Sequence, residues 1–209
     1  MVQNIVLVGE EALAMQTEQW IEDINKVEPR FFILDIIIIN PEMPNFEETI
    51  KERTAKYWNY KDSLFVLAFS KPVYKCKAAE ILDLHIKKYA NIIHPTASIS
   101  EDVKMGFGNI IFPNATISAN AVIENHVTVL FSGMGHDTAA ADYVTIGNGC
   151  DITGKVKLEK GADIGLAAVI LPDKKIGEWS DILPGSVVLR NVRPYSVVGG
   201  SPAKAVKSQ

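Results

Sequence analysis

A six-residue repeat runs from Ile93 through most of the remaining chain and limits the folds open to it. Counting in sixes meets a branched aliphatic residue at every step except Met105, on both sides of one interruption. This first series is Ile93, Ile99, Met105, Ile111, Ile117, Ile123 and Val129, then Ile146, Ile152, Leu158, Ile164, Ile170, Ile176, Ile182 and Val188. A second, smaller series lies two positions earlier: Ala97, Val103, Ala115, Ala121 and Val127, then Val144, Cys150, Val156, Ala162 and Ala168. A six-residue period fits neither a helix nor an alternating strand, and it predicts a parallel β-helix.

The period also predicts how this part of the chain is built. Each hexad makes a short strand and a turn, and three hexads close one triangular coil. Coils stack at the inter-strand spacing of roughly 4.8 Å. The aliphatic series then fills the interior, where each fully buried branched side chain contributes about 1.5–3 kcal/mol. Coils of this kind present flat outer faces, so we expect a homo-oligomer.

The first 90 residues follow a different pattern. Continuous apolar runs at 4–9, 30–39 and 63–70 are typical of strands in a parallel sheet that is buried on both faces. Helix-like segments at 10–27, 45–58 and 72–89 alternate with them. Strands and helices in this order predict a small Rossmann-like domain. The expected division is therefore a Rossmann-like domain at 1–90 and a β-helix domain with a C-terminal tail at 91–209.

Charge and cysteine content exclude several classes of partner. The net charge of −4 over 209 residues gives no basic field that would attract nucleic acid or an anionic membrane. The N-terminus has no signal-peptide pattern, and the apolar run at 31–39 is too short to span a bilayer. Cys76 and Cys150 fit neither a disulfide framework nor a CxxC metal site. We expect a cytoplasmic protein.

The repeat is interrupted once, and a His-Asp pair lies in the interruption. From Val129 to Ile146 is 17 residues, whereas three hexads need 18. Gly133, Gly135 and Ala140 stand where aliphatic residues are expected, so the coil should deform locally. His136 and Asp137 lie in this segment, either as a functional pair held at a relaxed turn or as an ordinary surface turn.

Several stretches resemble the hexapeptide-repeat acetyltransferases of the sialic-acid and nucleotide-amino-sugar type. They are "NIIHPTASIS", the segment "GHDTAAADYVTIGNGCDITGKVKLEKGADIG", and "LPGSVVLRNVRPYSVVGGSPAKAVK" near the C-terminus. The resemblance is strong after residue 91 and weak before it. It implies a Rossmann-like domain followed by a left-handed β-helix, assembled as a homotrimer with active sites between subunits. It also implies acetyl transfer from acetyl-CoA to the amine of an amino sugar or nucleotide sugar.

The resemblance assigns three residues to the chemistry. His136 matches the family's catalytic base, and an imidazole suits proton removal near neutral pH. Asp137 matches the acidic residue that supports the histidine, as a carboxylate does in a catalytic triad. Gly154 matches a glycine whose N–H faces the thioester carbonyl, where a small residue lets the substrate approach.

Other family positions fall on residues that depart from the pattern. Thr145 stands where the family has a second histidine that contacts acetyl-CoA. Leu166 and Pro184 fall at further CoA-lining positions, the latter in place of a glycine.

In the N-terminal domain the resemblance points to a nucleotide site with a changed loop. Gly9 is the one glycine left of the phosphate-binding turn, and Glu10 and Glu11 follow it where they should repel a diphosphate. Asp35, placed at the end of the core of the second strand, matches an acidic residue near the nucleotide. Lys75 takes the place of a family arginine.

The remaining histidines do not suggest a metal site. His94 belongs to the joint between the domains, His85 is expected on a helix, and His126 falls at a hexad corner, so three imidazoles do not converge. No metal is expected. Two alternatives to an N-acetyltransferase remain: a sugar O-acetyltransferase using the same base, and a non-catalytic trimeric β-helix protein.

Overall fold

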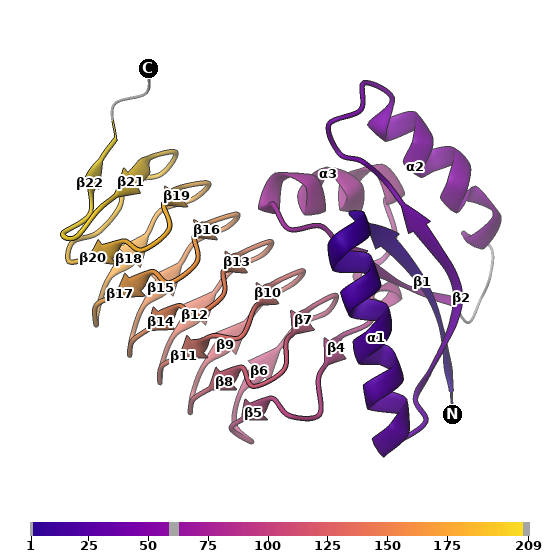
Figure 1. Ribbon diagram of the computed structural model, residues 1–209, viewed down its shortest axis with the longest axis horizontal. Coiled ribbons are helices and arrows are strands. Elements are labelled where there is room, and N and C mark those ends of the chain that lie inside the picture. Colours follow the sequence, from indigo (N-terminus) through magenta and orange to yellow (C-terminus); the bar gives the residue numbers. More distant parts are fainter. Residues whose placement is uncertain (1, 59–62, 207–209) are drawn as a thin grey trace.

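The computed structural model describes residues 2–58 and 63–206, so 207–209 of the expected tail lie outside it. An α/β part at the N-terminus packs against the first coils of a long parallel β-helix (Figure 1). The two parts follow each other along the chain, and the C-terminal strands lie at the end of the β-helix that is farthest from the α/β part (Figure 1).

The α/β part contains a parallel three-stranded sheet in the order β2-β1-β3. Its strands are β1 (Gln3–Gly9), β2 (Phe31–Ile38) and β3 (Ser63–Ala68). Its helices are α1 (Glu11–Val27), α2 (Phe46–Thr54) and α3 (Pro72–Leu82), with 3₁₀ turns η1 (Ala55–Tyr57) and η2 (Ile86–Lys88). One face of the sheet packs on α1 and the first β-helix coils, and the other packs on α2 and α3. Burial on both faces explains the continuous apolar runs of the three strands.

The third helix is shorter than the predicted segment 72–89. It ends at Leu82 because Asp83 adopts a left-handed conformation (φ 44°) and its N–H bonds the carbonyl of Ala79. The prediction that His85 lies on a helix is therefore wrong. His85 precedes η2, and its Nδ1 accepts a hydrogen bond from the N–H of Lys87 at 3.3 Å.

Three parallel sheets form the walls of the β-helix, and each coil contributes one strand to each wall. Sheet B contains β4 (Ile92–Ile93), β7 (Ile110–Ile111), β10 (Thr128–Val129), β13 (Thr145–Ile146), β16 (Asp163–Ile164), β19 (Asp181–Ile182), β21 (Val197–Gly199) and the antiparallel β22 (Lys204–Ala205). Sheet C contains β5 (Ser98–Ile99), β8 (Thr116–Ile117), β11 (Gly133–Met134), β14 (Asp151–Ile152), β17 (Val169–Ile170) and β20 (Val187–Val188). Sheet D contains β6 (Lys104–Met105), β9 (Val122–Ile123), β12 (Ala139–Ala140), β15 (Lys157–Leu158) and β18 (Lys175–Ile176).

Both predicted series point into this prism. Every member of the aliphatic series from Ile111 to Val188 is at most 2% exposed, and the small residues pack beside them. Ile93, Ile99 and Met105 belong to the first coil and are only partly buried. The hexapeptide prediction is therefore confirmed for the architecture and for the core.

The interruption lies elsewhere than predicted. The aliphatic series continues through Met134 and Ala140, which are 1% and 0% exposed, so Gly133 and Gly135 replace no core residue. The missing residue belongs to the turn at Leu130 and Phe131, which joins β10 to β11.

That short turn packs against the α/β part and leaves the next turn regular. Phe131 lies edge-on to Phe112 at 5.3 Å between centroids, and Phe112 contacts Trp20 of α1. The turn that carries His136 has normal geometry, since Asp137 shares its left-handed φ (58°) with the corner residues of neighbouring coils. The predicted distortion at the His-Asp pair is therefore wrong.

A buried lysine joins the two parts of the molecule. Lys75 of α3 is 1% exposed, and its Nζ donates to Thr128 Oγ1 and to the carbonyl of Val144, both at 3.1 Å. Burial lowers the pKa of this ammonium to about 7, because the charged form has lost its water.

Candidate functional site

His136 and Asp137 form a pair at the corner between β11 and β12. The Nδ1 of His136 lies 2.7 Å from Oδ2 of Asp137, and both side chains are exposed to solvent. The hydrogen bond from His136 is the main cause that lowers the pKa of the Asp137 carboxyl. A carboxylate can only accept, so Nδ1 carries the proton and Nε2 keeps a free lone pair. An exposed imidazole in this tautomer can act as a base.

Gly154 lies directly beside the imidazole, one coil further along. A Cβ added to Gly154 would lie 2.5 Å from Nε2 of His136 and 2.8 Å from its Cε1. The carbonyl of His136 accepts the N–H of Lys155 at 2.8 Å, which ties the two turns together. Within residues 2–58 and 63–206 the N–H of Gly154 donates no hydrogen bond. A proton acceptor therefore lies beside a glycine whose backbone N–H has no hydrogen-bond acceptor among the described residues.

The positions expected to line CoA lie away from this pair. Leu166 and Pro184 are exposed at the corner between sheets B and C, whereas His136 and Gly154 lie at the corner between sheets C and D. Thr145 is buried in β13, and its Oγ1 donates to the carbonyl of Ser70 at 3.0 Å. One chain therefore unites His136, Asp137 and Gly154 but separates them from the other three predicted positions.

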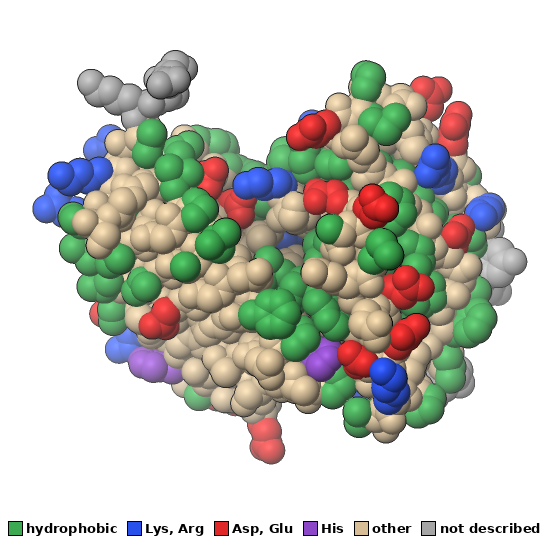
Figure 2. Space-filling model, in the orientation of Figure 1, with side chains coloured by type: hydrophobic (Ala, Val, Ile, Leu, Met, Phe, Trp, Pro, Cys, Tyr) green, Lys and Arg blue, Asp and Glu red, His purple; other side chains and the backbone are tan. Residues whose placement is uncertain are grey.

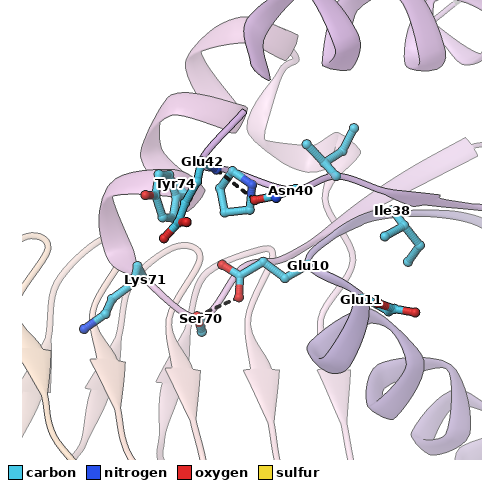
Figure 3. Close-up of a pocket in the computed structure, with 10 residues that line it drawn as sticks. Glu10, Glu11, Ile38, Asn40, Glu42, Ser70, Lys71 and Tyr74 are labelled. Carbon is cyan, nitrogen blue, oxygen red and sulfur yellow. Dashed lines mark hydrogen bonds between the residues drawn. The ribbon is translucent and has the colours of Figure 1, made fainter. Parts of the chain in front are cut away.

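A second candidate site is a pocket of about 430 Å³ in the α/β part (Figure 3). It opens where the parallel strands end, the edge at which open α/β sheets bind ligands. Its lining residues are Glu10, Glu11, Ile38, Ile39, Asn40, Pro41, Glu42, Ser70, Lys71 and Tyr74. Of these residues, Glu10 and Glu11 are predictable from the sequence, because they directly follow Gly9 at the end of β1. The other polar lining residues follow β2 and β3. Their position just after a predicted strand is the feature from which they could have been predicted.

Acidic groups dominate the charge of this pocket. Glu10, Glu11 and Glu42 line it, and Oε2 of Glu10 accepts a hydrogen bond from Ser70 Oγ at 2.8 Å (Figure 3). Lys71 is the single basic residue of the lining, and its Nζ lies 2.8 Å from Oδ2 of Asp163 on the β-helix. Acidic side chains lie on both sides of the hollow between the two parts of the molecule (Figure 2). An incoming phosphate would compete with Asp163 for Lys71.

Gly9 and Asp35 are placed differently from the expectation. Gly9 is buried at the end of β1, and a Cβ there would lie 2.1 Å from the carbonyl oxygen of Ala68, so close strand packing explains this glycine. Asp35 lies in the middle of β2, three residues before its end, and lines a different pocket. Its Oδ2 accepts from Tyr57 Oη at 2.6 Å and lies 3.2 Å from Nζ of Lys56. The structure therefore does not bring Asp35 to the acid-lined pocket.

The other histidines have structural roles. His126 is 2% exposed and stacks on Tyr143, and burial lowers its pKa to about 4. His94 is nearly buried at the joint between the two parts, with Nδ1 2.9 Å from Thr96 Oγ1. Across the described residues, no three His, Cys, Asp or Glu side chains gather as a metal-ligand set. In the same part of the chain, every helix is too short or too polar to cross a membrane.

The fold and the repeat define a hexapeptide-repeat β-helix protein with an exposed His-Asp pair at one corner. Comparisons with known proteins show which class of enzyme it resembles. No protein-family model matches the sequence. The GDP-perosamine N-acetyltransferase of Escherichia coli O157:H7 is 32% identical over 155 residues, which cover 71% of this chain and 70% of that protein. The chain therefore belongs to the family of hexapeptide-repeat sugar acetyltransferases.

Solved structures agree on the fold. A histidine mutant of perosamine N-acetyltransferase from Caulobacter crescentus, in complex with CoA and GDP-perosamine, aligns over 100% of this chain and 99% of its own, with a TM-score of 0.79 and 18% identity. The acetyltransferase domain of PglB from Neisseria gonorrhoeae, in complex with acetyl coenzyme A, aligns over 99% and 100%, with a TM-score of 0.79 and 16% identity. These neighbours have left-handed β-helices, which confirms the expected handedness.

Serine acetyltransferases also match, over a smaller part of their length. That of Buchnera aphidicola is 32% identical over 118 residues, 55% of this chain. The chain spans about 40% of the length of these relatives. The match to enzymes with a different acceptor indicates that the shared region does not by itself define the acceptor.

Proposed function

We propose that this protein transfers the acetyl group of acetyl-CoA to the amine of an amino sugar, with His136 as the general base. One observation carries the proposal: the hydrogen bond to Asp137 fixes the tautomer of His136, and its free Nε2 lies so close to Gly154 that a Cβ there would come within 2.5 Å of it. The relatives and the structural neighbours support it, because they are acetyltransferases.

The residues at this corner divide the chemistry between them. Acetyl-CoA supplies the activated acyl group. His136 Nε2 accepts the amine proton as the nitrogen forms its bond to the acyl carbon, and it returns that proton to the sulfur as the C–S bond breaks. Asp137 stabilises the imidazolium that exists between these two transfers. The N–H of Gly154 donates to the carbonyl oxygen, where negative charge develops.

Binding of CoA is assigned to Leu166 and Pro184, which are exposed, and not to Thr145, which is buried and donates its hydroxyl hydrogen to Ser70. Because their corner lies across sheet C from His136, a complete site requires a second chain that places its own corner beside the first. This arrangement supports a homotrimer with sites between subunits. In such a trimer, the flat faces of each β-helix would pack against the neighbouring subunits.

The acid-lined pocket is proposed to bind the part of the acceptor that is farthest from its reacting amine. Glu10, Glu11 and Glu42 oppose a diphosphate, so the usual contact between a nucleotide sugar and a glycine-rich turn is absent. The acceptor then binds through neutral groups, or it carries no nucleotide. Gly9 acts here by letting β1 and β3 approach each other. Asp35 lines a separate pocket and is assigned no part in this site.

Transfer assays with paired acceptors test this function. The protein is incubated with acetyl-CoA and a free amino sugar, the same sugar linked to UDP, or the matching sugar with hydroxyl in place of amine. Release of CoA thiol and the mass of the product are followed. The proposal predicts an N-acetylated product from an amine acceptor. Acetylation of the hydroxyl sugar alone would replace it with O-acetylation, and no CoA release with any acceptor would favour a non-catalytic β-helix.

A further inference from the structure

A buried hydroxyl lies two residues after His136, at a position that is apolar in three other coils. Thr138 directly precedes β12, and the residues that directly precede β6, β9 and β15 are Val103, Ala121 and Val156. The side chain of Thr138 is 0% exposed. A buried hydroxyl is unfavourable unless it is hydrogen-bonded, whereas valine or alanine carries no such cost. Core packing alone therefore does not explain a threonine here.

The hydroxyl of Thr138 holds the peptide that links Thr153 to Gly154 in the next coil. Oγ1 of Thr138 donates to the carbonyl oxygen of Thr153 at 3.0 Å. In a trans peptide the C=O and the N–H that follows it point in opposite directions. Because the carbonyl of Thr153 is directed to a fully buried hydroxyl, the N–H of Gly154 is directed away from Thr138.

The same peptide lies against the backbone of the turn that carries His136. A Cβ added to Gly135 would lie 2.6 Å from the carbonyl carbon of Thr153 and 2.7 Å from the nitrogen of Gly154. The N–H of Gly135 also donates to the carbonyl of Ile152 at 2.6 Å. Backbone contacts thus fix where the peptide lies, and the hydrogen bond to its carbonyl fixes how it is rotated.

We infer that Thr138 is a positioning residue, which orients the N–H of Gly154 toward the carbonyl oxygen of the acetyl group. The inference rests on the proposed role of that N–H as the donor to this oxygen. The bond from Thr138 fixes the peptide plane before acetyl-CoA binds, so the donor needs no reorganisation as negative charge develops. Without the hydroxyl, the carbonyl of Thr153 loses its partner and the peptide can rotate, which turns the N–H away from the oxygen.

Variants of Thr138 and one matched control test this role. Thr138→Val removes the hydroxyl but keeps the branched shape, which fits because Val156 holds the equivalent position in the next coil. Thr138→Ala, which copies Ala121 of the preceding coil, takes its place if the valine variant does not fold. Thr138→Ser keeps a hydroxyl. The control is Ser180→Ala, because Ser180 is 1% exposed and its Oγ donates to the carbonyl of Gly177 at 2.6 Å, at the corner between sheets D and B.

Two measurements follow the peptide and the reaction separately. The ¹H–¹⁵N signal of the Gly154 amide reports the peptide in the free protein, and CoA release reports kcat. Thr138→Val should move this signal and lower kcat by about 10- to 100-fold at unchanged KM for acetyl-CoA, since complete loss of an oxyanion donor costs about 10²–10³ and a turned donor costs less. Thr138→Ser and Ser180→Ala should match the wild type in both measurements.

The outcomes distinguish this inference from the proposed function. An unmoved Gly154 signal in Thr138→Val would overturn the inference and leave the role of Gly154 as donor intact. Equal losses in Thr138→Val and Thr138→Ser would also overturn it, because the hydroxyl would then not be the cause. A moved signal with the kcat of the wild type would refute the donor role of Gly154, and the positioning role of Thr138 with it.

Discussion

Replacing Gly154 by alanine should displace the proposed base without unfolding the coil. The added Cβ would lie 2.5 Å from Nε2 and 3.0 Å from Cδ2 of His136. Ordinary contacts of a Cβ begin near 3.4 Å, so the ring must retreat by about 0.9 Å. A shift of about 1 Å at a reacting group reduces turnover roughly 10²-fold. We therefore expect kcat of Gly154→Ala to fall by about two orders of magnitude.

Stability should change little, because the imidazole is exposed and can move into solvent. The expected change in the free energy of unfolding is within about 0.5 kcal/mol. Gly133→Ala is the matched control in the same coil as His136, since its Cβ meets only Thr116 Oγ1, at 3.3 Å. Steady-state CoA release and thermal unfolding are measured on both. Wild-type kcat in Gly154→Ala, with a crystal structure showing the ring displaced, would refute the link between the position of His136 and catalysis.

Three further predictions concern other parts of the molecule. The pKa of Lys75 is about 7 in the folded state and 10.5 ordinarily, so the unfolded state binds more protons between these values. The free energy of unfolding should then gain about 1.4 kcal/mol per pH unit from Lys75 in this window, and denaturant titrations from pH 7.5 to 9.5 should show that gain vanish in Lys75→Met. An equal pH slope in both proteins would show that the lysine is not neutral when buried. Light scattering at micromolar concentration should report a trimer, and a monodisperse, active monomer would contradict the shared site. Calorimetric titration should show weak binding of UDP that tightens about tenfold when Glu10 and Glu11 are both changed to Gln, whereas tight binding that these changes reduce would contradict the charge argument.

The β-helix could be predicted from sequence because its core is a one-dimensional pattern. Each aliphatic position from Ile111 to Val188 has the same environment, so the period alone places it inside. The register of the short coil was harder, since one missing residue can be assigned to either of two turns. A count of five from Val129 reaches Met134, and the next two steps of six reach Ala140 and Ile146. This count places the missing residue before Met134. The glycines on both sides of Met134 made that position look unlike a core position.

The candidate site was predictable only where it is local. His136 and Asp137 are adjacent in sequence, and Gly154 is one coil away, so the repeat brings all three together. Thr145 and Asp35 depended on resemblance alone, and the structure places them in separate environments. Asn40 and Tyr74 line the α/β pocket because the parallel strands end there. Their place in the pocket can be predicted only when the ends of the strands are known.

The most direct test of the central claim is the turnover of His136→Ala with acetyl-CoA and the acceptor identified by the paired assays. Removing a general base typically lowers kcat by 10²–10⁴. We expect a loss in this range, with the affinity for CoA nearly unchanged because the residues proposed to line CoA lie at another corner of the prism. Turnover near that of the wild type would show that the His136–Asp137 pair is not the catalytic centre.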